Sequence, residues 1–114
     1  MVACTATLNT LAADYAAAGT WIGLTTGNPG TGTTPENEAT GGSYARVQTT
    51  WSAYGVGTQN GTTVTIQAPA GIYTNAFIAS ASTGNNMTDN IAFATPITLL
   101  AAGQITFTLS YAQT

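Results

Sequence analysis

An alternating pattern of apolar and hydroxyl-bearing residues near the C-terminal end of the chain is the strongest indication of its fold. Every second position there is apolar: Ile105, Phe107, Leu109 and Tyr111. The positions between them carry hydroxyl groups: Thr106, Thr108 and Ser110. Side chains of a strand point to opposite faces in turn, so the pattern predicts one strand with an apolar face and a solvated face. Residues 62–68 repeat the pattern, which makes a mainly β fold the expectation.

Further short strands are predicted between turn signals. They cover residues 20–26, 46–51, 72–79 and 90–94, and the third is apolar enough to be central in a sheet. The turn signals are Asn28-Pro29-Gly30, Gly41-Gly42 and Pro69-Ala70-Gly71. Short strands at this spacing predict an antiparallel β-sandwich or a jelly-roll-like fold.

The N-terminal segment has a helical period instead. Its apolar stripe, at spacings of three and four, is Leu8, Leu11, Ala12 and Tyr15. Asn9 or Thr10 is expected to cap the start of the helix, and Gly19 to end it. We expect one domain over residues 1–114, with a helical segment at 1–19 and a β region at 20–114. The stripe has two interpretations: it packs on the domain's own core, or Leu8, Leu11 and Tyr15 form an interface between subunits.

Charge is nearly absent. The chain has one basic and four acidic residues, no histidine, and a charged fraction of 4%, against about 25% in ordinary soluble domains. A net charge of −3 with one arginine excludes phosphate-backbone binding to nucleic acid and a polybasic membrane surface. No apolar run is long enough for a transmembrane helix. Such a weakly repelling surface suits a protein that lies against copies of itself.

The residues for catalysis are missing. No histidine is available for acid–base chemistry, one cysteine cannot form a zinc cluster, and the lysine of a phosphate-binding loop is absent. Glu36 and Glu38 could serve as paired carboxylates of a glycosidase, or belong to a solvated loop. A calcium site at these glutamates or at Asp89-Asn90 would need about six to eight oxygen ligands. The chain is therefore predicted to be no enzyme, with no cofactor and no metal.

Arg46 is the exception in a chain that avoids charge. It lies in the predicted strand 46–51, where a partly buried cation needs a partner. Glu38 is the best candidate, because the Gly41-Gly42 turn lets the chain double back. We predict that this ion pair pins the loop 31–42 to the sheet. The alternative is an exposed, unpaired arginine.

The segment 21–46 resembles small phage virion proteins, which are described as head decoration, tail fibre or minor tail proteins. The matching motifs are WIGLTT at 21–26, NPG at 28–30 and NEATGGSYAR at 37–46. The segments 69–79 and 91–114 resemble the second half of such proteins. The resemblance implies a β domain with an N-terminal helix, built into the virion as an oligomer. It transfers no active-site residues, and Gly27 and Asn28 stand where an acid is common.

Three functions follow as hypotheses. The first is a capsid decoration protein, a homo-oligomer such as a trimer that contacts the major capsid protein or other virion proteins. The second is a tail-fibre or minor tail component that binds host sugar through exposed aromatic side chains. The candidates for that contact are Trp21, Trp51, Tyr44 and Tyr54. The third is a non-viral adhesion module, which the N-terminus disfavours because residues 1–4 lack a secretion signal. We therefore expect synthesis in the host cytoplasm and a place in the virion.

Overall fold

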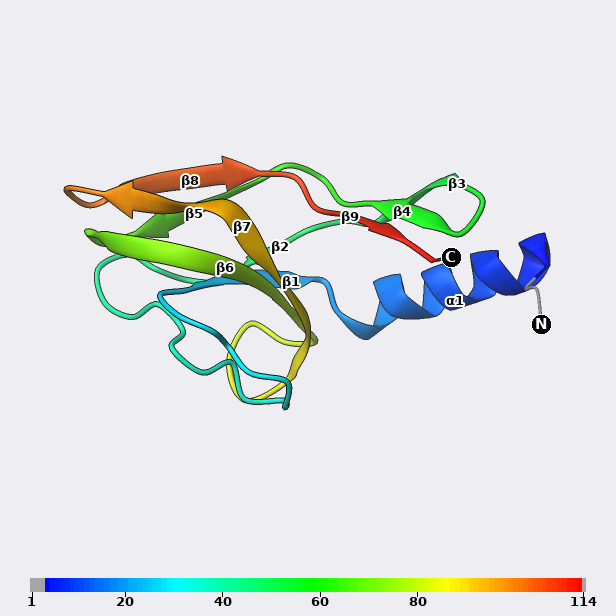
Figure 1. The fold of residues 1–114 in the computed structure, drawn as a ribbon, viewed down its shortest axis with the longest axis horizontal. Coiled ribbons are helices and arrows are strands. Elements are labelled where there is room, and N and C mark those ends of the chain that lie inside the picture. The colour runs from blue at the N-terminus through cyan, green and yellow to red at the C-terminus, as the bar shows by residue number, and fades with distance from the viewer. Residues whose placement is uncertain (1–3, 114) are drawn as a thin grey trace.

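A computed structural model describes residues 4–113 (Figure 1). One helix, α1 (Thr5–Ala18), precedes the strands. These are β1 (Trp21–Thr25), β2 (Val47–Gln48), β3 (Ser52–Gly55), β4 (Thr58–Asn60), β5 (Val64–Ala68), β6 (Gly71–Ala79), β7 (Met87–Leu99), β8 (Gly103–Phe107) and β9 (Ser110–Ala112). Residues 1–3, part of the N-terminal segment in which we expect no secretion signal, lie outside the described residues.

The strands form three antiparallel sheets. The largest has the order β2-β1-β6-β7, the second is β3-β4-β9 and the third is the pair β5-β8. Figure 1 shows β5 and β8 above β6 and β1, so these two sheets form the layers of a small sandwich. The predicted mainly β fold with an N-terminal helix is confirmed.

The core lies between the two layers. Its main cluster is Ile22, Leu24, Ala39, Val64, Ile66, Ala68, Tyr73 and Ile105. A second cluster of Phe77, Ala79 and Met87 packs with Trp21. Burying each large apolar side chain contributes about 1.5–3 kcal/mol. We call this part of the molecule, β1, β2 and β5–β8 with their loops, the sandwich end.

The alternating patterns place their side chains as expected, but not all strand boundaries match. In β5 the apolar side chains are buried and Thr65 and Gln67 are exposed. The stretch 105–111 keeps its alternation, yet it is two strands, because β8 pairs with β5 and β9 pairs with β4. The predicted strand 46–51 shrinks to the two residues of β2, and the predicted strand 90–94 extends to the whole of β7.

The helix begins earlier than predicted and makes fewer contacts. It starts after Cys4, which makes no side-chain cap, and Ala12 is its buried residue. Asn9 does not cap the start; its side-chain oxygen accepts a hydrogen bond from the Gly57 backbone nitrogen at 2.9 Å. Figure 1 shows α1 projecting from one end of a molecule of 47 × 25 × 23 Å, beside β3, β4 and β9. We call these four elements the helical end. Within residues 4–113, no helix has the length and hydropathy to cross a membrane.

Candidate functional site

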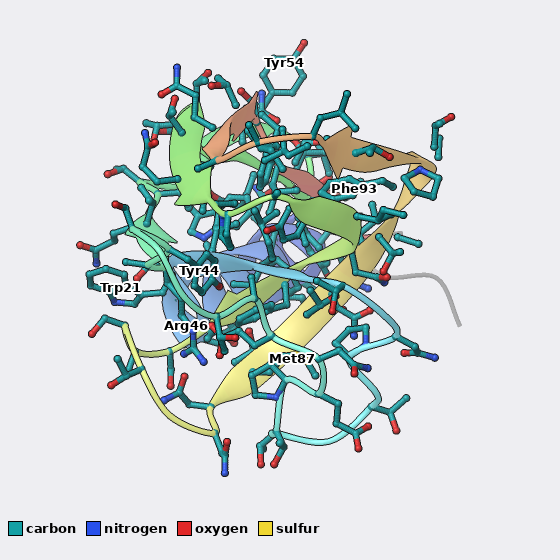
Figure 2. The ribbon with its side chains drawn as sticks, turned by 90° about the vertical axis from the view of Figure 1, so that its left-hand side faces the viewer. Trp21, Tyr44, Arg46, Tyr54, Met87 and Phe93 are labelled. Carbon is teal, nitrogen blue, oxygen red and sulfur yellow. The ribbon has the colours of Figure 1, made fainter. Side chains whose placement is uncertain are left out.

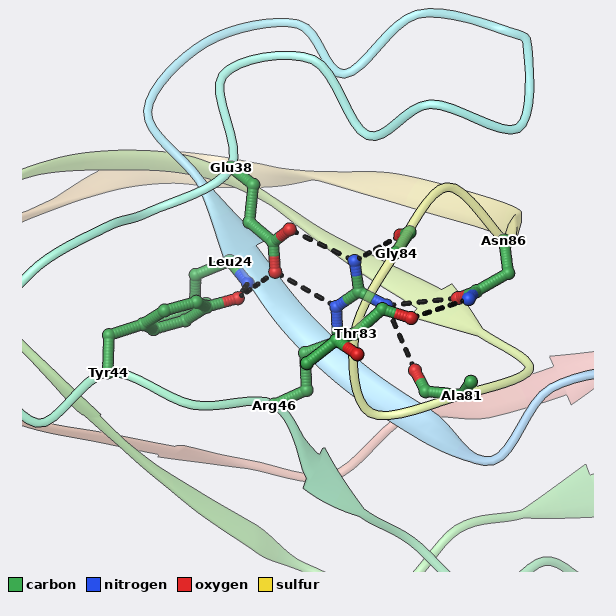
Figure 3. Close-up of polar contacts among 8 residues, drawn as sticks. All are labelled: Leu24, Glu38, Tyr44, Arg46, Ala81, Thr83, Gly84 and Asn86. Carbon is green, nitrogen blue, oxygen red and sulfur yellow. Dashed lines mark hydrogen bonds and ion pairs between the residues drawn. The ribbon is translucent and has the colours of Figure 1, made fainter.

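Arg46 lies at the centre of the most extensive polar cluster in the described structure (Figure 3). It directly precedes β2, and 6% of its surface is exposed. Its Nε donates to Oε2 of Glu38 at 2.9 Å, and its Nη2 donates to Oε1 at 3.0 Å. This fork geometry fits a carboxylate with two parallel bonds, which lysine cannot reproduce. The structure thus places Glu38 and Arg46 in direct contact.

The remaining Arg46 donors reach the loop 80–86. Nη1 donates to the Ala81 carbonyl at 2.9 Å and to Oδ1 of Asn86 at 3.0 Å. Nη2 also donates to the Gly84 carbonyl at 2.8 Å. With the two bonds to Glu38, all five guanidinium N–H groups have acceptors. The cation lies 4.9 Å from the centre of the Phe77 ring, so it joins two loops to the core.

Tyr44 completes the cluster. Its hydroxyl donates to Oε2 of Glu38 at 2.8 Å and accepts a hydrogen bond from the Leu24 nitrogen at 3.1 Å. Burial raises the pKa of the Tyr44 phenol above its ordinary value, and the charge of Glu38 acts in the same direction. The phenol is therefore neutral and keeps its donor. The hydrogen bonds of Glu38, Tyr44 and Arg46 thus hold the loops 26–46 and 80–86 together.

A cleft opens on the opposite side of the sheet from this cluster, between α1, β6, β7 and β9. It has a volume of about 180 Å³. Its lining includes the side chains of Tyr15, Ile78, Asp89, Ile91, Leu109 and Tyr111. The Tyr15 ring stacks on the Tyr111 ring with 3.6 Å between centroids, and its hydroxyl donates to Oδ2 of Asp89 at 2.9 Å. Burial is the main cause that raises the pKa of Tyr15, with Asp89 adding to it.

The three helix residues predicted as an interface occupy different surroundings. Tyr15 is half-buried against Tyr111, with Trp51 in edge contact at 6.0 Å. Leu8 is half-buried, near the turn at Gly57, where a Cβ would lie 3.1 Å from that of Leu8. Leu11 is 42% exposed. Two of these three residues therefore pack on the chain itself, and Leu11 remains on the surface.

The aromatic side chains considered for sugar binding also differ. Trp21 packs against the second core cluster, and Trp51 donates its indole N–H to the Gly19 carbonyl at 2.8 Å. Tyr44 belongs to the arginine cluster. Tyr54 is 76% exposed, and Figure 2 shows it pointing away from the ribbon. Of these four, Tyr54 has the free ring that stacking on a ligand requires.

Among residues 4–113, no three His, Cys, Asp or Glu side chains come together in a way that could hold a metal ion. Glu38 is occupied by Arg46 and Tyr44. Asp89 accepts hydrogen bonds from Tyr15 and from the Asn90 nitrogen.

The fold and the arginine cluster define a small β-sandwich protein in which the polar groups around Arg46 hold its own loops together. A family model described as "Podophage GP4 fiber I protein gp80" matches residues 4–113. The chain belongs to this family and is therefore a phage virion structural protein. No curated protein and no solved structure matches the chain.

Proposed function

We propose that this chain is a structural, non-enzymatic subunit of a podophage fibre, which works as a homo-oligomer. The observation that carries the proposal is the family match over residues 4–113. The family description fits the tail-fibre hypothesis better than the capsid decoration hypothesis. The arginine cluster supports a structural role, because its polar groups hold loops and leave no reactive group aimed at a ligand.

The helical end supports self-association. The 14-residue helix buries one residue fully, and isolated helices of this length are marginal in water. The neighbouring β3 is exposed at all four positions, and Val56 in the β3–β4 turn is 55% exposed. Leu11, Tyr54 and Val56 thus leave apolar groups exposed at this end, which copies of the chain can cover. Few charges oppose such an approach.

Binding to the host surface is the finer part of the proposal. The exposed ring of Tyr54 offers an apolar face with a polar tip, a combination enriched at binding surfaces. Phage carrying Tyr54→Ala should adsorb to host cells more slowly than phage carrying Tyr54→Phe, which keeps the ring. Equal adsorption rates would remove Tyr54 from host recognition without touching the structural role.

The location of the protein in the particle tests the main proposal. Purified virions can be labelled with antibody against the chain and imaged by electron microscopy, while mass spectrometry measures copies relative to the major capsid protein. We expect label on fibres and a copy number far below that of the capsid protein. Label spread over the head at a comparable copy number would instead establish capsid decoration.

A further inference from the structure

The turn between β7 and β8 is built unlike an ordinary solvent-exposed turn. Its three residues are Leu100, Ala101 and Ala102, and all three are exposed. Leu100 is 93% exposed, the largest value among the exposed large apolar side chains. Exposed turns are normally rich in Gly, Asn, Asp, Ser and Pro, because these residues suit turn backbones and bind water. An apolar tip of this kind is suited to contact with another surface.

The cleft beside α1 has the size and chemistry to receive such a tip. Its apolar wall includes Ile78, Ile91 and Leu109, and Ile91 is 55% exposed. A cavity of about 150 Å³ accommodates benzene, so 180 Å³ is enough for a leucine side chain. Both oxygens of Asp89 already accept hydrogen bonds, so the cleft does not require a cationic ligand.

The turn and the cleft of one chain cannot meet. Figure 1 shows the β7–β8 turn at the far end of the long axis from α1, whereas the cleft lies beside α1 and β9. The long axis measures 47 Å. The tip can therefore fill the cleft of a second copy only. A contact between two different patches of identical subunits propagates, into a ring if the rotation closes and into a filament if it does not.

We propose that the Leu100 turn of one subunit inserts into the Tyr15–Ile91–Leu109 cleft of the next, as the head-to-tail contact of the fibre. This inference rests on the proposed fibre function, because a contact that repeats along an axis builds an elongated assembly from a chain of 114 residues. A three-residue turn buries far less than the roughly 1,600 Å² of a standard interface. The contact between two single subunits is therefore weak. When subunits also associate side by side through their helical ends, several such contacts form at once and bind more tightly together.

Disulfide trapping tests the contact with the purified full chain. In a Cys4→Ser background, one variant carries Leu100→Cys and a second, differently tagged, carries Ser110→Cys on β9 at the cleft. Under mild oxidation the mixture should give several-fold more heterodimer than either variant gives homodimer. A mixture of Leu100→Cys with Tyr54→Cys is the matched control, since Tyr54 is exposed away from this cleft. Heterodimer no more abundant than in the control, or homodimer in excess, overturns the proposal.

Sedimentation at high protein concentration gives a second readout. Leu100→Asp should lower the average mass of the assembled species, while Leu100→Met should leave it unchanged, and both should melt as the parent chain does because the side chain is solvent-exposed. Equal masses for the two variants contradict the contact. If the trapping and sedimentation tests fail, the proposed contact is wrong, but the virion labelling still decides whether the chain belongs to the fibre. If the label lies on the head, the fibre function is wrong, but a contact trapped by the disulfide still exists.

Discussion

The sandwich end and the helical end of this molecule are stabilised in different ways. The sandwich end contains both hydrophobic clusters and an arginine with all five donors satisfied. In the helical end, α1 buries Ala12 alone, and the buried hydroxyl of Thr58 has no hydrogen-bond partner in the described structure. From this difference we propose that the sandwich end folds on its own contacts, whereas the helical end gains much of its order from neighbouring subunits of the proposed homo-oligomer.

The exposed face of the β5–β8 pair shows how the sandwich end stays solvated without charge. Threonine hydroxyls bond across the strands at 2.7 Å between Thr63 and Thr108 and at 2.9 Å between Thr65 and Thr106. Gln67 donates to Gln104 at 3.0 Å in the same row. Such cross-strand pairs each contribute a few tenths of a kcal/mol to about 1 kcal/mol. They do so without ions, so this surface is expected to be insensitive to salt.

The largest effect is expected from Arg46→Met. It leaves Glu38 without its cation and removes donors from the Ala81 and Gly84 carbonyls, so the free energy of unfolding should fall by about 3–5 kcal/mol. Urea denaturation of the isolated chain measures it. Arg46→Lys is the matched control for charge, and it should restore little because lysine lacks the fork geometry. An unchanged melting temperature in Arg46→Met would show that the cluster does not hold the sandwich end.

A pair of truncations contrasts the two ends directly. Ile66→Ala, at a fully buried position, should cost about 2–5 kcal/mol of unfolding free energy, because it removes core contacts and leaves a cavity. Leu11→Ala, on the exposed face of α1, should change the free energy by no more than about 0.5 kcal/mol in the monomer. Comparable losses for both variants would mean that the helix is part of one cooperative core.

Removal of the Tyr15 ring should loosen the helical end. Tyr15→Ala loses the stack on Tyr111, the edge contact with Trp51 and the bond to Asp89, which together are worth about 2 kcal/mol. On heating, the helical signal in circular dichroism should fall at a lower temperature than the global unfolding transition of the chain. Tyr15→Phe keeps the rings and loses only the hydroxyl bond, so its effect should be about 1 kcal/mol. Full retention of helix in Tyr15→Ala would contradict the role of this stack.

The smallest effect is expected from alkaline pH. Burial raises the pKa of Tyr15 and Tyr44 in the folded chain, so the folded state holds the phenol protons more tightly than the unfolded state does. Their contribution is complete below the ordinary pKa of about 10 and is lost as the pH rises above it. The melting temperature should therefore decline above about pH 10. The decline should be shallower in Tyr44→Phe, and an identical slope would contradict this assignment.

The sequence predicted those parts of the fold that depend on local pattern. The alternation in β5, the apolar run of β6 and the contact between Glu38 and Arg46 across a glycine turn are all short-range signals. The break between β8 and β9 was missed, because Thr108 and Leu109 continue the alternation while the pairing partner changes from β5 to β4. The β3–β4 hairpin was missed as well, since its residues are exposed throughout β3 and show no alternation.

The cleft could not be predicted, because it depends on distant parts of the chain. Tyr15 and Asp89 are 74 positions apart, and neither has a motif that points to the other. Distant contacts also explain why β2 is short. Arg46 does not continue a strand, because its side chain bonds to the carbonyls of Ala81 and Gly84 in the loop 80–86. Tertiary contacts thus override local propensity at both sites.

Hydrogen exchange followed by mass spectrometry, on the monomer and on the assembled protein, measures how much order each end has alone and how much assembly adds. In the monomer, amides of β5, β6 and β8 should exchange slowly, while those of α1, β3 and β4 exchange quickly; assembly should slow exchange at the helical end selectively. Equal protection of both ends in the monomer, unchanged by assembly, would show that the helical end does not depend on neighbouring subunits.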